Sequence, residues 1–510
     1  MSIIRLSSPT KNLKDQYDVV VIGSRYGGAI AASRLARAGC QVCVLERGKE
    51  IQPGEYPDTL PKVVREIQTD SPAIQTGAAT NLYDFHINKD MSVLAGCGLG
   101  GTSLTNAGVA RRPPPDVFAD AITNAASIAQ RLEAVARFGR FFIGSLWDAL
   151  GVAVAKPNFF NPQAEPRKKR PLRAPAPVIH FFTTADGVQL RLMRYEGGSK
   201  GPVILTHGVG VSSLIFRIDT IATTLVEYLV ARGFDVWLLD YRASIELPSC
   251  YFQSTADDVA TYDYPAAVAK VLELTGTKSV QMVVHCFGSA SFFMAMLKGL
   301  QGVRSAVSSQ VATHFVVPAA TEIKTGLHIT DFLKSLGVES LTAYVDQHTD
   351  WKGRLYEAAM RLYPMAFRER CVSPVCHRIT FMYSQVFDHR QLNAATHANL
   401  QEMFGVANIS AFEHLSRMVR KGHLVTAAGA NAYLPHLERL AIPIAFIHGG
   451  DNQCFLPRST EITHDLLCEK NGKNLYTRHV IPHYGHADSI LGKNAAKDVY
   501  PHIADHLESP

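Results

Sequence analysis

The sequence lacks the features that would indicate a membrane-spanning, secreted or nucleic-acid-binding protein. No uncharged apolar run reaches the roughly 18 residues that span a bilayer, and residues 1–16 contain no apolar signal core. The nine cysteines are scattered without the spacing of a small disulfide framework. A net charge of +6 over 510 residues, with no basic groove interleaved with aromatic residues, argues against nucleic-acid binding. We therefore expect a cytoplasmic protein with reduced thiols and no membrane span.

The length and composition predict more than one domain. A chain of 510 residues is too long for one ordinary core, and 47% hydrophobic with 19% charged residues is typical of a well-packed globular protein. A proline-rich, basic stretch at 157–177 divides the chain. It contains Arg167-Lys168-Lys169-Arg170, which predicts a solvated linker first and a localisation signal second. We expect a first domain at 1–156 and a second at 178–510.

The strongest motif for chemistry lies at 280–290, where an apolar run ends in a tight turn and opens into a helical segment. This pattern is typical of a nucleophile elbow, in which a sharp turn from strand to helix exposes the nucleophile, here Cys286. Small residues must follow because the backbone folds back closely on itself, and Gly288-Ser289-Ala290 meets that need. Compared with G-x-S-x-G, Val284 replaces the first glycine and cysteine replaces serine. The alternative is a buried strand with a core cysteine.

Strands and helices alternate along the second domain. A D-G turn at Asp186-Gly187 predicts a hairpin between 178–182 and 188–195. Short apolar runs separated by helical stretches then predict an α/β fold with a doubly wound, mostly parallel sheet and right-handed crossovers. The predicted strands are 203–206, 234–239, 280–284, 303–317, 442–448 and 474–481, and helices are expected at 221–232 and 265–275.

Residues 319–440 interrupt this alternation with an insertion of mainly helical patterns, at 330–344, 354–363 and 400–419, without a convincing strand pair. An insertion at this point leaves the sheet at the carboxyl ends of the strands, where ligands bind in doubly wound folds. We expect a helical lid whose apolar residues line a pocket for a hydrophobic substrate. The alternative is a purely structural helical cap.

The second domain resembles the α/β-hydrolase fold, and more closely its acid-lipase-like branch, over about 178–507. Four further stretches, in the family's order, carry the resemblance. Residues 205–213 resemble the loop that supplies an oxyanion donor, and 233–242 resemble the strand and turn that follow. His448-Gly449-Gly450-Asp451 is similar to the turn holding the family's acid, and Tyr484-Gly485-His486-Ala487-Asp488 to the turn holding its histidine.

This resemblance and the chemistry together predict a catalytic triad of Cys286, His486 and Asp451. A thiol nucleophile needs a base within hydrogen-bond reach and an acid that fixes the tautomer of the base. The chain order nucleophile, acid, histidine is the one that this fold uses. The backbone N–H groups of Phe287 and Val209 are expected to stabilise the oxyanion of a tetrahedral intermediate.

Three neighbouring polar residues receive other roles. His483 precedes the glycine turn and is expected to be structural, whereas Asp488, two residues beyond His486, is expected to hold the loop. His285 alternates with Cys286 along the elbow, so we expect its side chain to point away from the chemistry.

A metal site is not expected. Cys371, Cys376 and His377 lie near one another in the sequence, but without a second ligand pair they do not predict a zinc site. We therefore expect no bound metal.

Cysteine in place of serine narrows the predicted reaction. A thiolate attacks thioesters readily and forms an acyl-enzyme that is itself a thioester, so the acyl group stays activated. We expect a thioesterase or acyltransferase that releases or lactonises a hydrophobic polyketide or fatty acyl group carried on coenzyme A or an acyl carrier protein. The logic is similar to that of fungal thioesterase-like polyketide cyclases, a looser resemblance. A carboxylic ester hydrolase or lipase with the same triad, and a non-catalytic binding protein, are alternatives.

The first domain carries a second resemblance. Residues 18–46 predict a strand, a glycine turn with Gly23 and Gly28, a helix, and a second strand ending in Glu46, which is the dinucleotide-binding arrangement. Together with 93–109, this segment resembles the flavin-binding part of glucose-methanol-choline (GMC) oxidoreductases, especially cholesterol-oxidase-like members. The resemblance implies an FAD-dependent oxidoreductase as an alternative of another class.

Two departures from that family argue against a bound flavin. Arg25 replaces the middle glycine, which exists so that the backbone can approach a pyrophosphate closely. The family's substrate domain and catalytic segment do not follow, and 117–150 instead predicts helix. We therefore expect a truncated Rossmann-like remnant at 1–156 that binds no cofactor and is retained as a packing partner.

Overall fold

The chain divides into two compact units, Met1–Asp148 and Ala149–Pro510, in a computed structural model. The structure describes residues 5–52, 55–57, 60–70, 75–86, 93–104, 159–318, 338–349 and 371–509, with Thr321, Glu322, Thr325, Lys334, Arg354, Glu357 and Glu369. The helix predicted at 117–150 lies outside these residues. Within them, no helix combines the length and apolarity needed to cross a bilayer.

The first unit contains the predicted strand, turn, helix and strand. β1 (Val19–Ile22) pairs in parallel with β2 (Val42–Leu45), and α1 (Tyr26–Arg37) connects them. A second sheet has the order β4-β3-β5-β6. Its strands are β3 (Ile67–Asp70), β4 (Gln75–Thr76), β5 (Tyr83–His86) and β6 (Val93–Gly96), and the remaining helices are η1 (Thr10–Asn12), α2 (Leu60–Arg65) and η2 (Gly101–Leu104).

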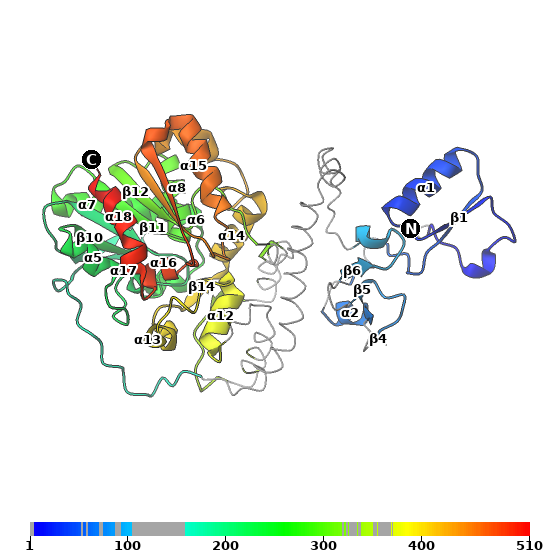
Figure 1. Ribbon diagram of the computed structural model, residues 1–510, viewed down its shortest axis with the longest axis horizontal. Coiled ribbons are helices and arrows are strands. Elements are labelled where there is room, and N and C mark those ends of the chain that lie inside the picture. The colour runs from blue at the N-terminus through cyan, green and yellow to red at the C-terminus, as the bar shows by residue number, and fades with distance from the viewer. Residues whose placement is uncertain are drawn as a thin grey trace. The chain divides into compact units, whose positions relative to one another are not determined.

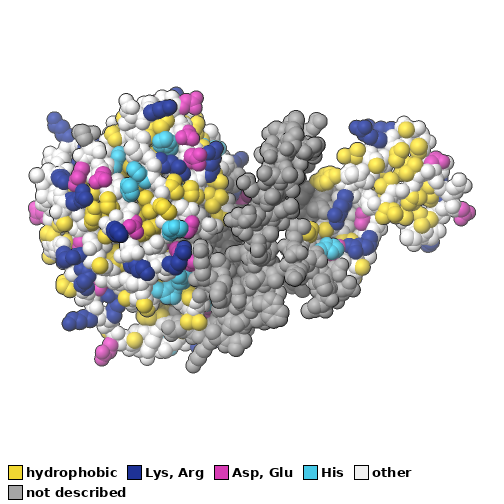
Figure 2. Space-filling model, in the orientation of Figure 1, with side chains coloured by type: hydrophobic (Ala, Val, Ile, Leu, Met, Phe, Trp, Pro, Cys, Tyr) yellow, Lys and Arg dark blue, Asp and Glu magenta, His cyan; other side chains and the backbone are white. Residues whose placement is uncertain are grey.

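A two-stranded sheet cannot bury both of its faces, and the first unit shows the consequence. Ile22 is 87% exposed and Ile30 is 57% exposed. Figure 2 shows hydrophobic side chains gathered on this unit. On the drawn face of the second unit, basic and acidic side chains are instead interspersed (Figure 2).

The second unit is built on an eight-stranded sheet, of which Figure 1 labels β10, β11 and β12. The strand order is β16-β15-β12-β11-β9-β10-β8-β7. All neighbours from β16 to β10 are parallel, and the hairpin strands β7 and β8 are antiparallel at one edge. The strands are β7 (Val178–Thr183), β8 (Gln189–Tyr195), β9 (Pro202–Thr206), β10 (Asp235–Asp240), β11 (Val280–His285), β12 (Val303–Ser309), β15 (Ile444–Gly449) and β16 (Tyr476–Ile481). The predicted mostly parallel sheet is therefore confirmed.

Helices cover this sheet because its central strands are apolar on both sides. Every residue of β9, β10, β11 and β15 is buried, as expected for parallel strands between helical layers. The helices of the sheet domain are η3 (Ser213–Phe216), α5 (Leu225–Ala231), η4 (Pro248–Tyr251), α6 (Ala256–Asp258), the π-helix η5 (Val259–Asp263), α7 (Tyr264–Thr275), α8 (Phe287–Leu297), η8 (Leu434–Leu440), α15 (Arg458–Asn471), η9 (Lys473–Leu475), α16 (Asp488–Leu491), α17 (Ala495–Asp498) and α18 (Tyr500–Glu508).

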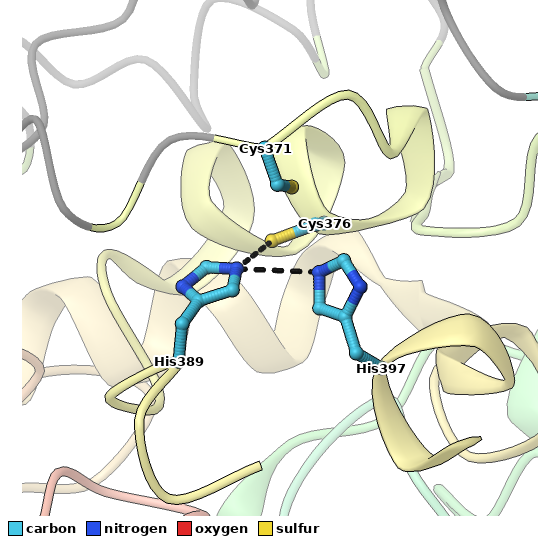
Figure 3. Close-up of side chains that lie close together, drawn as sticks. All are labelled: Cys371, Cys376, His389 and His397. Carbon is cyan, nitrogen blue, oxygen red and sulfur yellow. Dashed lines mark hydrogen bonds between the residues drawn. The ribbon is translucent and has the colours of Figure 1, made fainter. Parts of the chain in front are cut away.

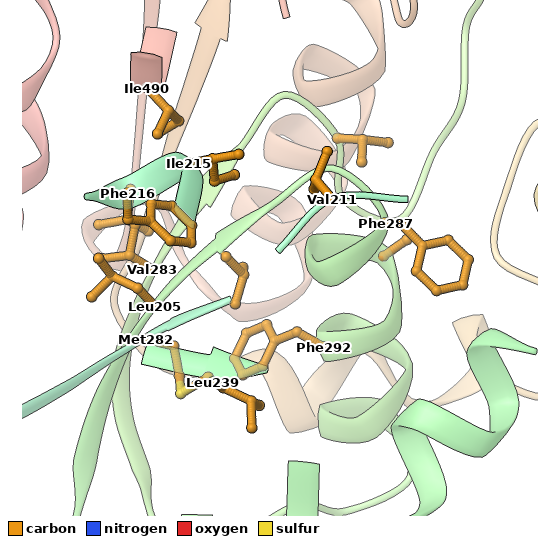
Figure 4. Packing of buried hydrophobic residues seen from close by; sticks show 14 of the residues in the cluster. Leu205, Val211, Ile215, Phe216, Leu239, Met282, Val283, Phe287, Phe292 and Ile490 are labelled. Carbon is orange, nitrogen blue, oxygen red and sulfur yellow. The ribbon is translucent and has the colours of Figure 1, made fainter. Parts of the chain in front are cut away.

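The core lies between the strands and α8. Leu239, Met282 and Val283 from the strands pack in one hydrophobic cluster with Phe292 of α8 (Figure 4). Complete burial of such a side chain stabilises the fold by roughly 1.5–3 kcal/mol. The cluster thus holds β11 and α8, the two elements that flank Cys286, in fixed positions.

The described part of the lid contains a strand pair, and the prediction of none is wrong. β13 (Ser340–Thr342) pairs antiparallel with β14 (Val406–Asn408). Strands of three residues are too short to show alternation in a sequence. The other elements are α12 (Pro374–Tyr383), α13 (Ala394–Ala398), η7 (Leu400–Glu402) and α14 (Ile409–Lys421), so only the second part of the helix expected at 400–419 forms. The helix predicted at 330–344 is wrong at its described end, where 340–342 form β13, and the helix predicted at 354–363 falls almost entirely outside the described residues.

The basic segment is fixed on the second unit and is not the solvated linker that its composition predicts. The Arg167 guanidinium lies 2.6 Å from Asp219 and 2.8 Å from Glu402. Arg170 lies 2.7 Å from Glu227. Hydrogen bonds from Arg167 lower the pKa of Asp219 to about 2. The acidic partners are distant in the sequence, so the sequence of the segment alone could not show these ion pairs.

Candidate active site

Cys286 stands at the turn between β11 and α8 with φ 57° and ψ −126°. Residues other than glycine rarely adopt positive φ, and such strain is concentrated at functional sites. The turn is tight enough that a Cβ on Gly288 would lie 2.3 Å from the carbonyl oxygen of His207. The structure therefore places Cys286 in the geometry of a nucleophile elbow.

Two backbone donors face the sulfur of Cys286. The N–H groups of Phe287, the first residue of α8, and Val209, in the loop after β9, both donate toward it. A carbonyl carbon bonded to this sulfur would place its oxygen near the same donors, as an oxyanion hole requires. Burial raises the pKa of the Cys286 thiol to about 12, and the two hydrogen bonds lower it by less. The resting sulfur is therefore a neutral thiol at physiological pH.

His486 lines the same cavity as Cys286. Its ring is buried, and Nε2 makes no hydrogen bond with any described residue. Burial, with the imidazoles of His285 and His448 nearby, holds the pKa of His486 well below its usual range. The ring is therefore neutral at physiological pH, which is the state a general base requires.

Asp451 does not contact His486, and the prediction that it is the acid of the triad is corrected. Its side chain is 39% exposed, and its carboxylate lies 3.8 Å from His483 and 3.9 Å from Arg390. The next residue, Asn452, is fully buried, and its Nδ2 lies 3.1 Å from His486 Nδ1. Of these two adjacent residues after β15, Asp451 is partly exposed to solvent and Asn452 is buried beside His486.

The amide of Asn452 is oriented by its other hydrogen bonds. Its Oδ1 accepts from the backbone N–H groups of Cys454, at 2.8 Å, and Phe455, at 3.2 Å. Its Nδ2 donates to Gln310 Oε1 at 2.9 Å. The second Nδ2 hydrogen therefore faces His486, whose Nδ1 accepts. The ring proton of His486 is then on Nε2, which has no hydrogen-bond partner in the part of the chain that the structure describes.

This network determines what His486 can do. In the resting tautomer, Nε2–H can donate a hydrogen bond but cannot accept the thiol proton. To take the thiol proton, Nε2 must carry a lone pair, so the ring proton must be on Nδ1. That Nδ1–H group then needs a hydrogen-bond acceptor. The Asn452 amide supplies one if it turns so that Oδ1 faces the ring, at the loss of its two backbone hydrogen bonds. The tautomer of the base thus depends on one buried amide.

His285 lies beside the chemistry, which corrects the expectation that it points away. It lines the same cavity, and its ring centroid is 4.9 Å from that of His486. Its Nδ1 is 3.0 Å from Ser309 Oγ, and burial lowers its pKa to about 3. The expectation assumed that side chains alternate from His285 to Cys286 as in a regular strand. Because Cys286 has positive φ, the alternation ends there, and the prediction for His285 is wrong.

Asp488 behaves as a structural group, whereas the structural role of His483 stays a prediction. Asp488 Oδ2 accepts from the backbone N–H groups of Gly485, at 3.0 Å, and Asp388, at 3.1 Å. It therefore holds the loop that carries His486, as predicted. His483 has φ 63° and a side chain 75% exposed.

The cavity at Cys286 is mainly apolar and is enclosed in part by the lid. Small-molecule sites are typically apolar cavities of this kind, in which a few polar groups fix the orientation of the ligand. The lid contributes Met382, Tyr383, Val386, Phe404, Phe412, Leu415 and Val419, and the sheet domain contributes Val209, Val211, Ile215 and Phe455. The arrangement suits an acyl chain whose carbonyl carbon lies at the sulfur.

In the first unit, the residues predicted at the phosphate turn do not fit a dinucleotide. The Arg25 stem fills the space beside Gly101, because a Cβ there would lie 2.1 Å from Arg25 Cγ. Glu46 Oε2 accepts from Ser24 N at 3.0 Å and Ser24 Oγ at 2.6 Å, and Oε1 accepts from Gly48 N at 3.0 Å. The acid that would hold a ribose is thus engaged within the turn.

The two glycines of that turn have packing roles. Gly23 has φ 87°, and a Cβ on Gly28 would lie 2.1 Å from the Gly23 carbonyl oxygen. They allow α1 to begin close to β1. This packing accounts for both glycines without a bound ligand.

Comparison with known proteins supports the fold of the second unit. Residues 201–325 match the α/β hydrolase fold family. The chain is 23% identical to Lipase lipl-1 of Caenorhabditis elegans, over 64% of this chain and 87% of that lipase. It is 22% identical to human Lipase member K, over 62% of this chain and 84% of that protein. The second unit is an α/β hydrolase in fold, and lipases are among its relatives.

The chain also matches a protein of another kind. A segment of 108 residues is 35% identical to a cholesterol oxidase of Mycobacterium tuberculosis. The match covers 21% of this chain and only 18% of the oxidase. The similarity is therefore to a small part of that enzyme.

The raised thiol pKa predicts how Cys286 reacts with alkylating reagents. Since only the thiolate attacks iodoacetamide, the rate at Cys286 should be low at pH 7 and should rise about tenfold per pH unit to beyond pH 9. Peptide mass spectrometry measures this rate. A rate that reaches its plateau below pH 7 would show a resting thiolate and contradict the geometry described above.

Exchange of Asn452 for a carboxylate should make His486 a stronger base. In Asn452→Asp the carboxylate accepts from Nδ1–H and stabilises the imidazolium, so alkylation of Cys286 at pH 7 should accelerate by about tenfold or more. Asp451→Asn is the matched control and should leave the rate unchanged. The opposite pattern, with an effect at Asp451 alone, would restore Asp451 as the third member of the triad.

The filled phosphate turn predicts that the purified protein carries no stoichiometric flavin. Arg25 occupies the position where the backbone must approach a pyrophosphate. The measurement is the visible absorbance of the native protein and the FAD released on denaturation. One FAD released per chain would prove the prediction wrong.

Proposed function

We propose that the protein is an acyl hydrolase that cleaves carboxylic esters of hydrophobic acids through an acyl-enzyme on Cys286. The observation that carries the proposal is the thiol at a nucleophile elbow, faced by two backbone N–H donors and opening into an apolar cavity. The lipase relatives support ester hydrolysis as the reaction class.

The acylation step assigns one role to each group. Cys286 Sγ attacks the ester carbonyl carbon, and the thiol proton passes to His486 Nε2 in the tautomer that Asn452 Oδ1 stabilises. The carbonyl oxygen becomes an oxyanion held by the N–H groups of Phe287 and Val209. The loss of one such donor costs about 3 kcal/mol in the transition state. The C–O bond then breaks, and the alcohol leaves with the proton from His486.

Deacylation runs through the same groups. Water attacks the carbonyl carbon of the Cys286 thioester while His486 Nε2 accepts a water proton. The C–S bond breaks, the proton returns to the sulfur, and the carboxylic acid leaves. Atoms and charge balance over the two steps, and the free thiol is restored.

A second candidate is acyl transfer from a thioester, favoured by cysteine at the nucleophile position. The acyl-enzyme is itself a thioester, so transfer from coenzyme A or an acyl carrier is nearly isoenergetic, whereas transfer from an oxygen ester is uphill. The apolar cavity also limits water at the acyl group. An alcohol of the acyl chain itself could then be the acceptor, which would give a lactone.

The decisive experiment compares an octanoyl ester with the octanoyl thioester of N-acetylcysteamine. Wild-type protein should gain the octanoyl mass from at least one donor, and Cys286→Ala should gain none and lose turnover by a factor of about 10³ or more. Cys454→Ala is the matched control, because Cys454 is a second cysteine that lines the cavity and lies outside the elbow. It should still form the adduct.

The donor preference separates the two candidates. A higher kcat/KM for the ester, retained in Cys286→Ser, supports the ester hydrolase. A higher kcat/KM for the thioester, with loss of acyl transfer in Cys286→Ser, supports the thioester reaction. Wild-type turnover by Cys286→Ala would contradict both.

A further inference from the structure

Four side chains with metal-binding atoms converge in the lid, away from the cavity at Cys286. They are Cys371, Cys376, His389 and His397 (Figure 3). One atom from each side chain, a sulfur or a ring nitrogen, lies within 4.8 Å of the others. Cys371 precedes α12, Cys376 lies in its first turn, His389 is in the following loop, and His397 is in α13.

Two separations in the cluster are those of a tetrahedral coordination shell. Cys376 Sγ lies 3.5 Å from His389 Nε2, which lies 3.2 Å from His397 Nε2. With Zn–N near 2.05 Å and Zn–S near 2.3 Å, a tetrahedral zinc ion separates two nitrogens by about 3.3 Å and a nitrogen from a sulfur by about 3.6 Å. Both separations that involve His389 match these edges, and all four donor atoms lie within 4.8 Å of one another, so a small movement of the side chains would close them around an ion.

Groups around the cluster orient its members. His389 Nδ1 is 2.8 Å from Glu369 Oε2, and Glu369 is completely buried. A carboxylate that accepts from Nδ1–H leaves the lone pair of Nε2 directed at the cluster, which is the usual second contact of a zinc-bound histidine. His377 instead contacts the Cys371 carbonyl oxygen at 2.9 Å and Glu357 at 2.6 Å. It supports the loop of Cys371 and is not a ligand.

We propose that Cys371, Cys376, His389 and His397 bind a structural Zn²⁺ ion. Two sulfurs and two imidazoles are a donor set that zinc prefers, and four protein ligands leave no open position for substrate. The spacing C-x4-C-x12-H-x7-H keeps the order of zinc-finger ligands with longer gaps. The second ligand pair, not apparent from the sequence alone, is thus His389 and His397.

The ion would tie the lid to the loop of the catalytic histidine. Between Cys376 and His389, the chain carries Val386, whose carbonyl oxygen accepts the backbone N–H groups of His486, at 3.0 Å, and Ala487, at 2.6 Å. α12 also carries Met382 and Tyr383 into the cavity wall. Because the ligands flank both features, loss of the ion should loosen the lid and the loop of His486 together.

The test is the metal content of tag-free, full-length protein, measured by plasma mass spectrometry. We expect about one zinc per chain, and its loss in Cys376→Ser and His397→Ala. Cys468→Ser is the matched control, because Cys468 Sγ forms a similar cysteine–histidine contact, 3.5 Å from His464 Nε2, outside the cluster. This variant should keep its zinc.

A second measurement avoids dependence on the folding of the variants. Removal of zinc from wild-type protein with a chelator should lower Tm by several degrees, and added Zn²⁺ should restore it. Added Co²⁺ should give the strong visible bands of a tetrahedral ion and a thiolate charge-transfer band. Wild-type protein that has no zinc and gives no such Co²⁺ spectrum would overturn the proposal, as would a Cys371–Cys376 disulfide in the native protein.

Discussion

The close approach of two backbone turns determines the geometry of the candidate active site. A Cβ on Gly288 would lie 2.3 Å from the His207 carbonyl oxygen, and a Cβ on Gly208 would lie 3.0 Å from Cys286 Cβ. Because both positions are glycine, the loop after β9 and the turn after β11 can meet. Their meeting brings the N–H groups of Val209 and Phe287 to the sulfur. The strain at Cys286 is sustained by the buried strands and α8 on either side.

A buried polar network sets the chemistry of the base. Asn452 is oriented by hydrogen bonds with Gln310 and with two backbone N–H groups. Its amide therefore donates a hydrogen bond to His486, whereas a carboxylate at this position would accept one. The thiol and the imidazole are therefore both neutral at rest, in contrast to an ion pair. Their apolar surroundings strengthen this state, since burial disfavours the charged form of each group. In the proposed mechanism, the proton is therefore transferred during attack, and a rearranged amide assists that transfer.

Features that depend on local sequence could be predicted, and features that depend on distant contacts could not. The elbow, the two N–H donors at the sulfur and the central strands follow from short apolar runs and small residues. The choice between Asp451 and Asn452 depends on which side chain turns inward in a loop, and no local pattern encodes that direction. The four ligands of the proposed zinc site come from separate elements, so only the folded lid brings them together.

The most direct test of this account is where the acyl group resides during turnover. Wild-type protein mixed with excess octanoyl donor and quenched in acid should carry the octanoyl mass on the peptide that contains Cys286, and neutral hydroxylamine should remove it as it does a thioester. Product formation with the acyl group on another residue, such as Ser289 or Cys454, or with no acylated peptide at any time, would contradict the central claim.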